Sequence, residues 1–434
     1  MPSRTDDADV IIIGGGPAGS GLATLVARDG RKVIVLEKDI HPRHHVGEAL
    51  TPSTTIVFDK LGFLETLEEE GFARKAGVGW TAPKSPAGKF FAVRTSDFPL
   101  PGAPRPYSFN VERGALDALL LKHAHLSGAS VLQGVNVRRV LFEEGRAVGV
   151  RASVMDGWER DLHAPVVVDA TGRRCLLANQ LGLRKRDPDF NQFSFYSWFR
   201  NVGPVPEGYE DFLFLHFLGM ERAWGWQIPL RNGIFSIGVI TDKRDFRRSG
   251  RSYGEFFEEL VGNSRSFSHV MRGAERVKPW WVEGDYSYTM DQFAGKGWLL
   301  VGDAFRFVDP IFSSGVDVAL YSALFAHEAL TRVWNGQSEE KAFHAYQSRV
   351  GEGVEVWYQL TDLSYRMPLL FTLFIVSRKY RAQLVRVLQG NPYLPETQAK
   401  AKEIIEQMWV FYEKTSRRAN SVLRPSALGP QPAA

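Results

Sequence analysis

A glycine-rich turn near the N-terminus limits what this chain can fold into more than any other feature of its sequence. The stretch from Asp9 to Lys38 reads DVIIIGGGPAGSGLATLVARDGRKVIVLEK. Four aliphatic residues precede glycines in G-x-G-x-x-G spacing, an Ala/Leu/Val-rich stretch follows as far as Arg28, and a second apolar run covers Val33 to Leu36. This order predicts a strand, a tight turn, a helix and a second, parallel strand.

Each part of this unit has a mechanical reason to be there. Gly14 lets the chain turn out of the strand, Gly16 lets the backbone approach a pyrophosphate, and Gly19 lets the helix pack closely on the strand. The unpaired N–H groups at the start of the helix favour phosphate. Glu37 ends the second strand, where a carboxylate can accept ribose hydroxyls. The unit predicts a bound dinucleotide; the alternative is a glycine-rich turn in an ordinary βαβ unit.

The composition is that of a globular protein with chain enough for two or three domains. Of its 434 residues, 44% are hydrophobic and 24% are charged. No apolar run approaches the roughly 18–20 residues that cross a bilayer, and the longest, Pro368 to Val376, predicts a buried helix. The polar N-terminus does not resemble a secretory signal. With Cys175 as its one cysteine the chain has no disulfide framework or cysteine metal cluster. We expect cytoplasmic residence, no integral membrane segment and no metal.

Two segments of this mildly basic chain are locally rich in cations. The net charge is +4, and the segments run from Lys243 to Arg251 and from Arg378 to Arg386. Such runs are usually solvated surface. A nucleic-acid role would need basic residues interleaved with aromatics on a recognisable module, which the sequence lacks. These segments are better suited to binding an acidic protein partner.

The remaining pattern predicts an α/β fold with an added antiparallel layer. Further buried strands are expected at Val166 to Gly172 and at Gly297 to Asp303, and two strands joined by a turn at Val131 to Val150. From Asn191 to Asp242 the pattern changes to long β-branched and aromatic strands, including a hairpin that turns at Asn232-Gly233.

Predicted helices cover Thr55 to Glu70, Val111 to Ser127 and most of the chain from Ala342 to Ser416. Together these elements divide the chain into three parts. We expect a discontinuous nucleotide-binding domain, an antiparallel substrate layer and a C-terminal helical region with a disordered Pro/Ala tail. Their respective bounds are residues 1–80, 105–185 and 286–341; 81–104 and 186–285; and 342–434.

Three separated stretches agree on one superfamily. The glycine fingerprint, the VVVDATG strand and the GWLLVGDAFRFVDP strand and turn resemble the FAD-binding elements of flavoprotein aromatic hydroxylases. The resemblance implies FAD rather than NAD. It also implies that Asp303 contacts the ribityl or phosphate groups, and that Arg113, at the head of NVERGALDALL, contacts the cofactor. The expected cofactor residues are Gly14, Gly16, Ala18, Gly19, Glu37, Lys38, Arg43, Arg113, Val137 and Asp303.

A narrower resemblance covers nearly the whole chain. WGWQIP, from Trp224 to Pro229, matches the W-x-W-x-I-P signature of flavin-dependent halogenases, and Lys75 in GFARKAG matches their lysine. FVDPIFSSGV resembles their halide-site loop. The HVGE, DPDFNQF and SWF segments resemble the short halogenases that act on pyrrolyl groups held on carrier proteins. The family implies a Rossmann-like FAD-binding domain interleaved with an antiparallel β substrate layer, plus C-terminal helices.

The resemblance also implies a chemistry. Reduced FAD and oxygen form a C4a-hydroperoxide, which oxidises chloride or bromide to hypohalous acid, and this is relayed to Lys75. Trp224 and Trp226 alternate on a strand and point to the same face. There they would fill the space beside the flavin that a hydroxylase leaves for its substrate. The alternative is that both are ordinary core aromatics.

The halide would be bound at the start of a helix. Backbone N–H groups of Ser314 and Gly315 can form an anion nest there. The alternative is a simple side-chain cap by Ser313 or Ser314, which is compatible with the nest. Phe312 stands where halogenases of free tryptophan carry a glutamate, which favours an electron-rich ring, pyrrole or phenol, on an acyl or peptidyl carrier protein.

No second nucleotide fingerprint is present in the sequence, so reduced flavin is expected from a separate reductase. The main alternative function is an NAD(P)H-dependent aromatic hydroxylase. A prenyl-lipid reductase of the same FAD fold is disfavoured by the tryptophan pair and Lys75. A non-catalytic FAD-carrying protein is the last alternative. Its distinguishing test is whether the reduced flavin reacts with oxygen to form a hydroperoxide.

Overall fold

A six-stranded sheet carries the glycine-rich turn. The computed structural model describes residues 6–154, 157–187, 190–203, 205–220, 222–284 and 287–422, with the backbone alone from residue 415. The sheet order is β20-β21-β11-β1-β2-β7, and only β20 is antiparallel to its neighbour. Its strands are β1 (Val10–Ile13), β2 (Val33–Glu37), β7 (Ser130–Gln133), β11 (Val166–Asp169), β20 (Ala294–Gly295) and β21 (Trp298–Leu300). Strands β1, β2 and β11 are wholly buried, as in sheets covered on both faces.

Helix α1 (Pro17–Arg28) follows the turn and packs against α9 (Ser314–Trp334) and α4 (Arg113–Leu126). Two glycines make this packing possible. Gly14 has φ +110°, and a Cβ there would lie 2.4 Å from the carbonyl oxygen of Ala170. A Cβ on Gly19 would lie 2.0 Å from the carbonyl oxygen of Gly14. The predicted strand–turn–helix–strand unit is confirmed.

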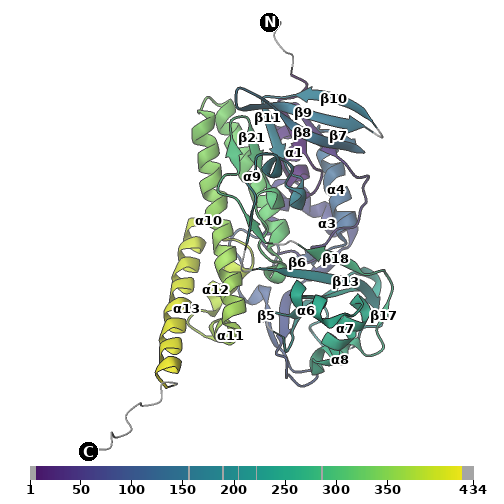
Figure 1. Ribbon diagram of the computed structural model, residues 1–434, viewed down its shortest axis with the longest axis vertical. Coiled ribbons are helices and arrows are strands. Elements are labelled where there is room, and N and C mark those ends of the chain that lie inside the picture. Colours follow the sequence, from purple (N-terminus) through teal and green to yellow (C-terminus); the bar gives the residue numbers. More distant parts are fainter. Residues whose placement is uncertain are drawn as a thin grey trace, which may run out of the picture.

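A three-stranded meander closes the upper lobe in Figure 1. It consists of β8 (Val135–Glu143), β9 (Arg146–Val154) and β10 (Trp158–His163). The predicted turn lies between β8 and β9, where Glu144 and Gly145 both have positive φ. The sequence prediction of two strands from 131 to 150 was incomplete, because Ser130–Gln133 forms a separate strand of the parallel sheet.

The lower lobe is a larger, mainly antiparallel sheet (Figure 1). Its order is β17-β13-β16-β15-β14-β4-β5, with β18 also paired to β13; only β4 and β14 are parallel. The hairpin between β15 and β16 turns through Asn232, at φ 58°, as predicted. The strands are β4 (Gly77–Thr81), β5 (Phe91–Arg94), β13 (Gln192–Arg200), β14 (Phe212–Phe217), β15 (Trp224–Pro229), β16 (Phe235–Asp242), β17 (Glu275–Arg276) and β18 (Trp281–Gly284).

Short elements complete the two lobes. Two small sheets pair β3 (Ala73–Lys75) with β6 (Ser108–Asn110) and β12 (Lys185–Arg186) with β19 (Tyr288–Thr289). Helix α5 (Leu176–Gln180) contacts β8. The helices that accompany the lower sheet are α6 (Lys243–Ser249), α7 (Tyr253–Gly262) and α8 (Arg265–Met271).

The helical segments are more broken than predicted. One helix was expected from Thr55 to Glu70, but α2 (Thr54–Lys60) and α3 (Leu64–Glu70) are separated at Gly62, which has φ 59°. The C-terminal region is helical as predicted, and Pro368 starts a new helix because it has no N–H to continue α10. Its helices are α10 (Glu339–Arg366), α11 (Pro368–Val376), α12 (Arg381–Leu388) and α13 (Pro395–Val422).

Helix α10 runs beside both lobes, and α11 to α13 lie beside the lower one (Figure 1). The predicted disordered tail falls on residues 423–434, outside the described part of the chain. Among the described helices, none combines the length and apolar character needed for a membrane span.

The prediction that Pro368–Val376 is a buried helix was wrong. The helix forms, but Leu369 is 81% exposed and Leu373 is 58% exposed. Phe371, Phe374 and Ile375 are buried on the opposite side. A continuous apolar run carries no periodicity, so the sequence could not show that one face lacks a covering element.

The close packing around the glycine turn predicts unequal effects of two alanine substitutions in α1. Gly19→Ala forces a Cβ into the Gly14 carbonyl and should lower the free energy of unfolding by about 2 kcal/mol. Gly21→Ala meets only ordinary contacts at 3.6 Å or more, so it should be neutral or stabilising by about 0.5–1 kcal/mol. Urea unfolding of both variants checks this; equal stabilities would contradict the packing account.

Candidate functional site

A cavity of about 380 Å³ lies between the nucleotide-binding turn and the lower sheet. Its wall is formed by the start of α1, the end of β2, the loop of residues 43–49, the loop before α9, and strands β14 and β15. Gly19 does not reach the cavity and acts in packing. The other predicted cofactor residues all line it: Gly14, Gly16, Ala18, Glu37, Lys38, Arg43, Arg113, Val137 and Asp303.

Glu37 supports the glycine-rich turn directly. One carboxylate oxygen accepts the Gly15 N–H at 2.6 Å, and the other accepts the Asp39 N–H at 2.8 Å. The side chain is buried yet reaches the cavity wall. It therefore holds the turn in place, while its predicted contact with ribose stays a prediction.

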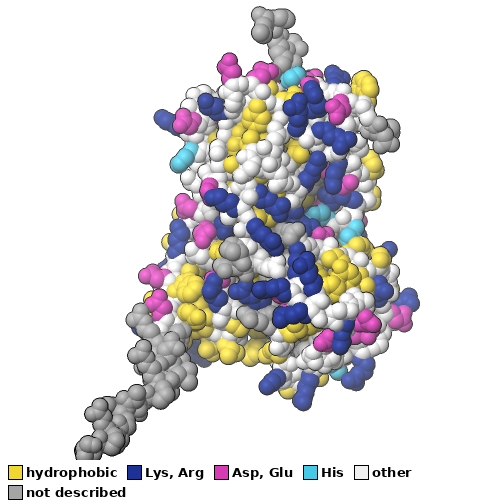
Figure 2. Space-filling view, viewed as in Figure 1, with side chains coloured by type: hydrophobic (Ala, Val, Ile, Leu, Met, Phe, Trp, Pro, Cys, Tyr) yellow, Lys and Arg dark blue, Asp and Glu magenta, His cyan; other side chains and the backbone are white. Residues whose placement is uncertain are grey.

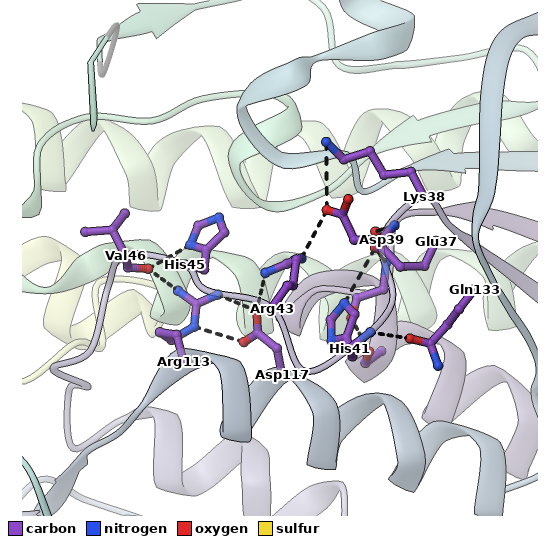
Figure 3. Close-up of polar contacts among 12 residues, drawn as sticks. Glu37, Lys38, Asp39, His41, Arg43, His45, Val46, Arg113, Asp117 and Gln133 are labelled. Atoms are coloured by element: carbon purple, nitrogen blue, oxygen red, sulfur yellow. Dashed lines mark hydrogen bonds and ion pairs between the residues drawn. The ribbon is translucent and has the colours of Figure 1, made fainter. Parts of the chain in front are cut away.

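Two arginines are held on the cavity wall by one buried carboxylate (Figure 3). Arg113 donates from Nε and Nη2 to the two oxygens of Asp117, at 2.9 and 3.0 Å, and from Nη1 to the carbonyl of Val46 at 2.6 Å. Nη1 of Arg43 lies 3.2 Å from the same carboxylate. Arg43 also lies 3.6 Å from Asp39 and beside the open side of Gly16, so the wall presents two guanidinium groups. Such a wall suits a pyrophosphate.

Asp303 follows β21 in a short 3₁₀ turn (Gly302–Ala304) and lines the cavity. Burial raises the pKa of its carboxyl to about 6, although the nearby Arg173 and Arg113 act in the opposite direction. The glycine turn, the paired arginines and this carboxyl share one cavity that continues to an aromatic wall. The residues present therefore fit a flavin dinucleotide.

The aromatic wall comes from β15. Trp224 and Trp226 both line the cavity, and their ring centroids lie 6.0 Å apart. The prediction that they share a face is confirmed. Trp224 donates its indole N–H to the hydroxyl of Tyr365 at 2.7 Å, and Trp226 donates to Oγ of Ser236 at 3.2 Å. They also belong to the apolar core of the lower lobe, so each ring serves packing and cavity shape together.

A hydrogen-bond chain connects this wall to the loop before α9. The Tyr365 hydroxyl, on α10, donates to the carboxylate of Asp309 with both oxygens at 3.1 Å. Asp309 in turn accepts the Ile311 N–H at 2.9 Å and caps a 3₁₀ turn (Pro310–Phe312). Sequence reasoning missed both residues. Asp309 stands inside the FVDPIFSSGV motif, whereas nothing in the helical pattern of α10 distinguishes Tyr365.

Ser313 departs from its predicted role. It has φ 57°, a left-handed conformation, and its side chain makes no capping hydrogen bond to α9, so the alternative of a side-chain cap by Ser313 is wrong. Its Oγ lies 3.4 Å from Nζ of Lys75 instead. Ser314 and Gly315 are the first residues of α9, where backbone N–H groups have no intrahelical acceptor. Gly315 lines the cavity and Ser314 does not.

Lys75 is buried beside this loop without a charged partner. It lies on β3 opposite Ser108 of β6, and Nζ donates to the carbonyl of Leu50 at 2.8 Å. The side chain is 4% exposed, and burial lowers the pKa of its amine to about 7. Among the described residues, no carboxylate lies within ion-pair distance of this amine. Ser313 lines the cavity whereas Lys75 does not, so Ser313 stands between the cavity and Lys75.

Comparison with known proteins agrees with this geometry. A model of the FAD binding domain family matches residues 7–357. The chain is 40% identical over 419 residues to a 1H-pyrrole-2-carbonyl-[peptidyl-carrier protein] chlorinase of Pseudomonas fluorescens, covering 93% of this chain and 92% of that protein. It is 32% identical to a flavin-dependent halogenase of Penicillium aethiopicum, covering 79% and 68%.

This chain belongs to the flavin-dependent halogenases.

A solved structure of a flavin-dependent brominase superposes with a TM-score of 0.85 at 26% identity, covering 94% of this chain and 99% of that one. The expected fold class, FAD cofactor and halogenase activity are thereby confirmed, and the hydroxylase alternative is the less supported reading. No comparison assigns individual site residues.

Three buried carboxyls near the site have raised pKa values, so each is partly uncharged at neutral pH. Burial raises the pKa of Glu48 and of Asp309 to about 7, and that of Asp317 to about 8. Glu48 lines the cavity and accepts the indole N–H of Trp198 at 2.7 Å. Because these groups lose their protons only near or above neutral pH, they oppose a bound halide weakly. Glu48 was missed, although it ends the HVGE segment, because its burial depends on contacts distant in sequence.

The buried amine predicts a pH-dependent stability. Its pKa is about 7 when folded against an ordinary value of 10.5. Between these values the unfolded state binds one more proton, so stability rises with pH by about 1.4 kcal/mol per unit. Below pH 7 the amine is protonated in both the folded and the unfolded state, and the free-energy cost of burying the charged amine is largest.

In Lys75→Met the carbonyl of Leu50 keeps the Ser108 hydroxyl as a donor at 2.7 Å. Denaturant unfolding from pH 7 to 10 should therefore show the unsubstituted protein gaining stability relative to Lys75→Met. Parallel curves would show that Lys75 titrates normally.

Proposed function

We propose that this halogenase chlorinates or brominates a pyrrole ring carried as a thioester on a peptidyl carrier protein. The structural observation that best supports halogenation is the desolvated amine of Lys75. It lies behind Ser313, which separates it from the flavin cavity. The Pseudomonas fluorescens relative is named for this substrate, as is a Pseudoalteromonas luteoviolacea brominase that is 28% identical. A phenol is the second candidate ring, since it is also electron-rich.

The proposed reaction takes place in two compartments, the flavin cavity and the surroundings of Lys75. Bound reduced FAD and oxygen would supply the oxidant that turns halide into hypohalous acid. Trp224 and Trp226 occupy the cavity wall and keep an organic ring away from that oxidant. The N–H groups of Ser314 and Gly315 hold the halide, and hypohalous acid passes Ser313 to Lys75.

At Lys75 the amine needs a lone pair. With a pKa of about 7, a large share of it is neutral at physiological pH. The neutral amine can take halogen from hypohalous acid, forming an N–halogen bond and releasing water. Alternatively, the ammonium form donates a hydrogen bond that makes the halogen more electrophilic. Both routes place the halogen at one point beyond the cavity.

The absence of a carboxylate at position 312 supports an activated ring. Phe312 stacks on Phe371 at 5.6 Å and on Trp357 at 6.3 Å. Aromatic side chains at this place cannot stabilise a charged intermediate as a carboxylate does. A pyrrole or phenol depends less on such help, because its heteroatom delocalises the positive charge.

We also propose that a separate reductase delivers the reduced flavin. The support is that the family match is to one FAD-binding domain, and that the sequence holds a single glycine fingerprint. Cytoplasmic residence and a place in natural-product biosynthesis stay predictions.

The substrate proposal is tested by incubating the protein with reduced FAD, oxygen, chloride and a pyrrolyl-loaded carrier protein. Intact-protein mass spectrometry should show chlorine replacing hydrogen, with the chlorine isotope pattern. A free phenol and an NADPH-only reaction serve as comparisons. Hydroxylated product formed from NADPH alone, without halide, would favour the hydroxylase and overturn the proposal.

Lys75→Ala tests whether oxidation of the flavin and transfer of the halogen take place at separate groups. This variant should bind FAD and oxidise reduced flavin at the normal rate, because Lys75 does not line the cavity. It should form no halogenated product, a loss of at least about a thousandfold for a removed reactive group. Released hypohalous acid should appear in solution, where monochlorodimedone traps it. Normal halogenation by the variant would contradict the proposed role of Lys75 in halogen transfer.

A further inference from the structure

The two basic segments of the sequence have different surroundings in the structure. The first, residues 243–251, covers α6, and three of its five cations are paired with nearby carboxylates. Arg244 pairs with Asp242, Arg248 with Asp245, and Arg251 with Glu259. These are ordinary surface ion pairs, so these three arginines offer little net charge to a partner.

The second segment, residues 378–386, keeps its charge. Arg378, Lys379 and Arg386 are exposed, and none of them has an ion pair in the described part of the chain. Arg381 lies over the ring of Phe98, with its guanidinium carbon 5.1 Å from the ring centroid. From residue 363 to residue 394 the sequence contains no aspartate or glutamate. The charge of the segment itself is therefore of one sign, and Glu403 of the adjoining α13, which acts on Lys379, pairs with Lys400.

An apolar stripe adjoins these cations. Leu369, Leu373 and Val376 are exposed by 81%, 58% and 44%, and their i, i+4, i+7 spacing places them on one face of α11. Figure 2 shows hydrophobic side chains beside Lys and Arg at the end of the molecule where α11 and α12 lie. An apolar centre with a charged rim is the usual composition of a protein-binding surface.

The inner face of the same helix reaches the halogenation site. Phe371 is buried and stacks on Phe312, the residue directly before Ser313. Tyr365, on the turn of α10 that precedes α11, holds Trp224. One helix thus separates the exposed stripe from the loop beside Lys75, so a partner on this surface would sit next to the site.

We propose that α11 and α12 form the docking surface for the carrier protein, whose acidic helix binds Arg378, Lys379 and Arg386 while apolar residues cover Leu369 and Leu373. The inference rests on the proposed carrier-bound substrate and names where that substrate's protein is held. Charge complementarity favours an acidic partner. The short path through α11 to Phe312 favours the carrier over an anionic membrane or a second copy of the chain.

The test compares two triple charge reversals of equal net charge. The first carries Arg378→Glu, Lys379→Glu and Arg386→Glu on the docking surface. The control carries Arg244→Glu, Arg247→Glu and Arg248→Glu on α6, all of them exposed. Binding of the pyrrolyl-loaded carrier is measured by fluorescence anisotropy at increasing salt, and kcat and KM for its halogenation are measured in parallel.

The docking variant should weaken carrier binding and raise KM by about tenfold or more, with the salt dependence flattened. FAD affinity and oxidation of reduced flavin should stay unchanged, and the control should bind the carrier within about twofold of the unsubstituted protein. Leu373→Ser should weaken binding at all salt concentrations, because it removes apolar contact rather than charge.

Carrier binding is measured separately from formation of halogenated product. Different results therefore contradict the proposed function and the proposed docking surface. Carrier that binds but is not halogenated would overturn the proposed function and leave the docking surface in place. Equal carrier binding by all three proteins would overturn the docking surface while leaving the function intact. Binding of phosphatidylserine-containing vesicles without binding of the carrier, or concentration-dependent dimers lost in Leu373→Ser, would also overturn it.

Discussion

The proposed chemistry depends on one amine that the fold keeps out of water. Lys75 is buried with two hydrogen-bond partners, the carbonyl of Leu50 and the hydroxyl of Ser313, and its pKa falls to about 7. A buried cation without a counter-ion is costly, so the fold favours the neutral amine. Nothing in catalysis by FAD itself calls for such a residue. The proposed reaction of the amine with an electrophilic halogen would account for this cost.

The partition between cavity and amine follows from the loop before α9. Asp309 caps the 3₁₀ turn, Ser313 adopts a left-handed conformation, and α9 begins directly afterwards. Tyr365 ties this loop to Trp224, so the aromatic wall and the loop form one hydrogen-bonded unit. In the proposed function, hypohalous acid passes Ser313 within this unit, and the two indoles on the cavity wall keep an organic ring from the flavin.

Local patterns predicted the parts of the site that are local in sequence. The glycine turn, Glu37 and the tryptophan pair need only backbone period and residue size, and the structure places them as the patterns require. Contacts between distant segments could not be predicted. Tyr365 meets Trp224 across 141 residues, and Lys75 meets Ser313 across 238. The exposed face of α11 was also missed, since which face is covered depends on the packing of the whole helical region.

The account is tested most directly by measuring the pKa of Lys75. Protein labelled with [ε-¹³C]lysine and loaded with FAD is titrated by NMR, with Lys75→Met used to assign the resonance. One lysine signal should titrate near pH 7, in accordance with the desolvated amine, and it should be missing from the variant. If every lysine titrates near 10.5, the amine is charged at neutral pH and carries no lone pair for a halogen. The account of a desolvated, neutral amine would then be contradicted at its centre.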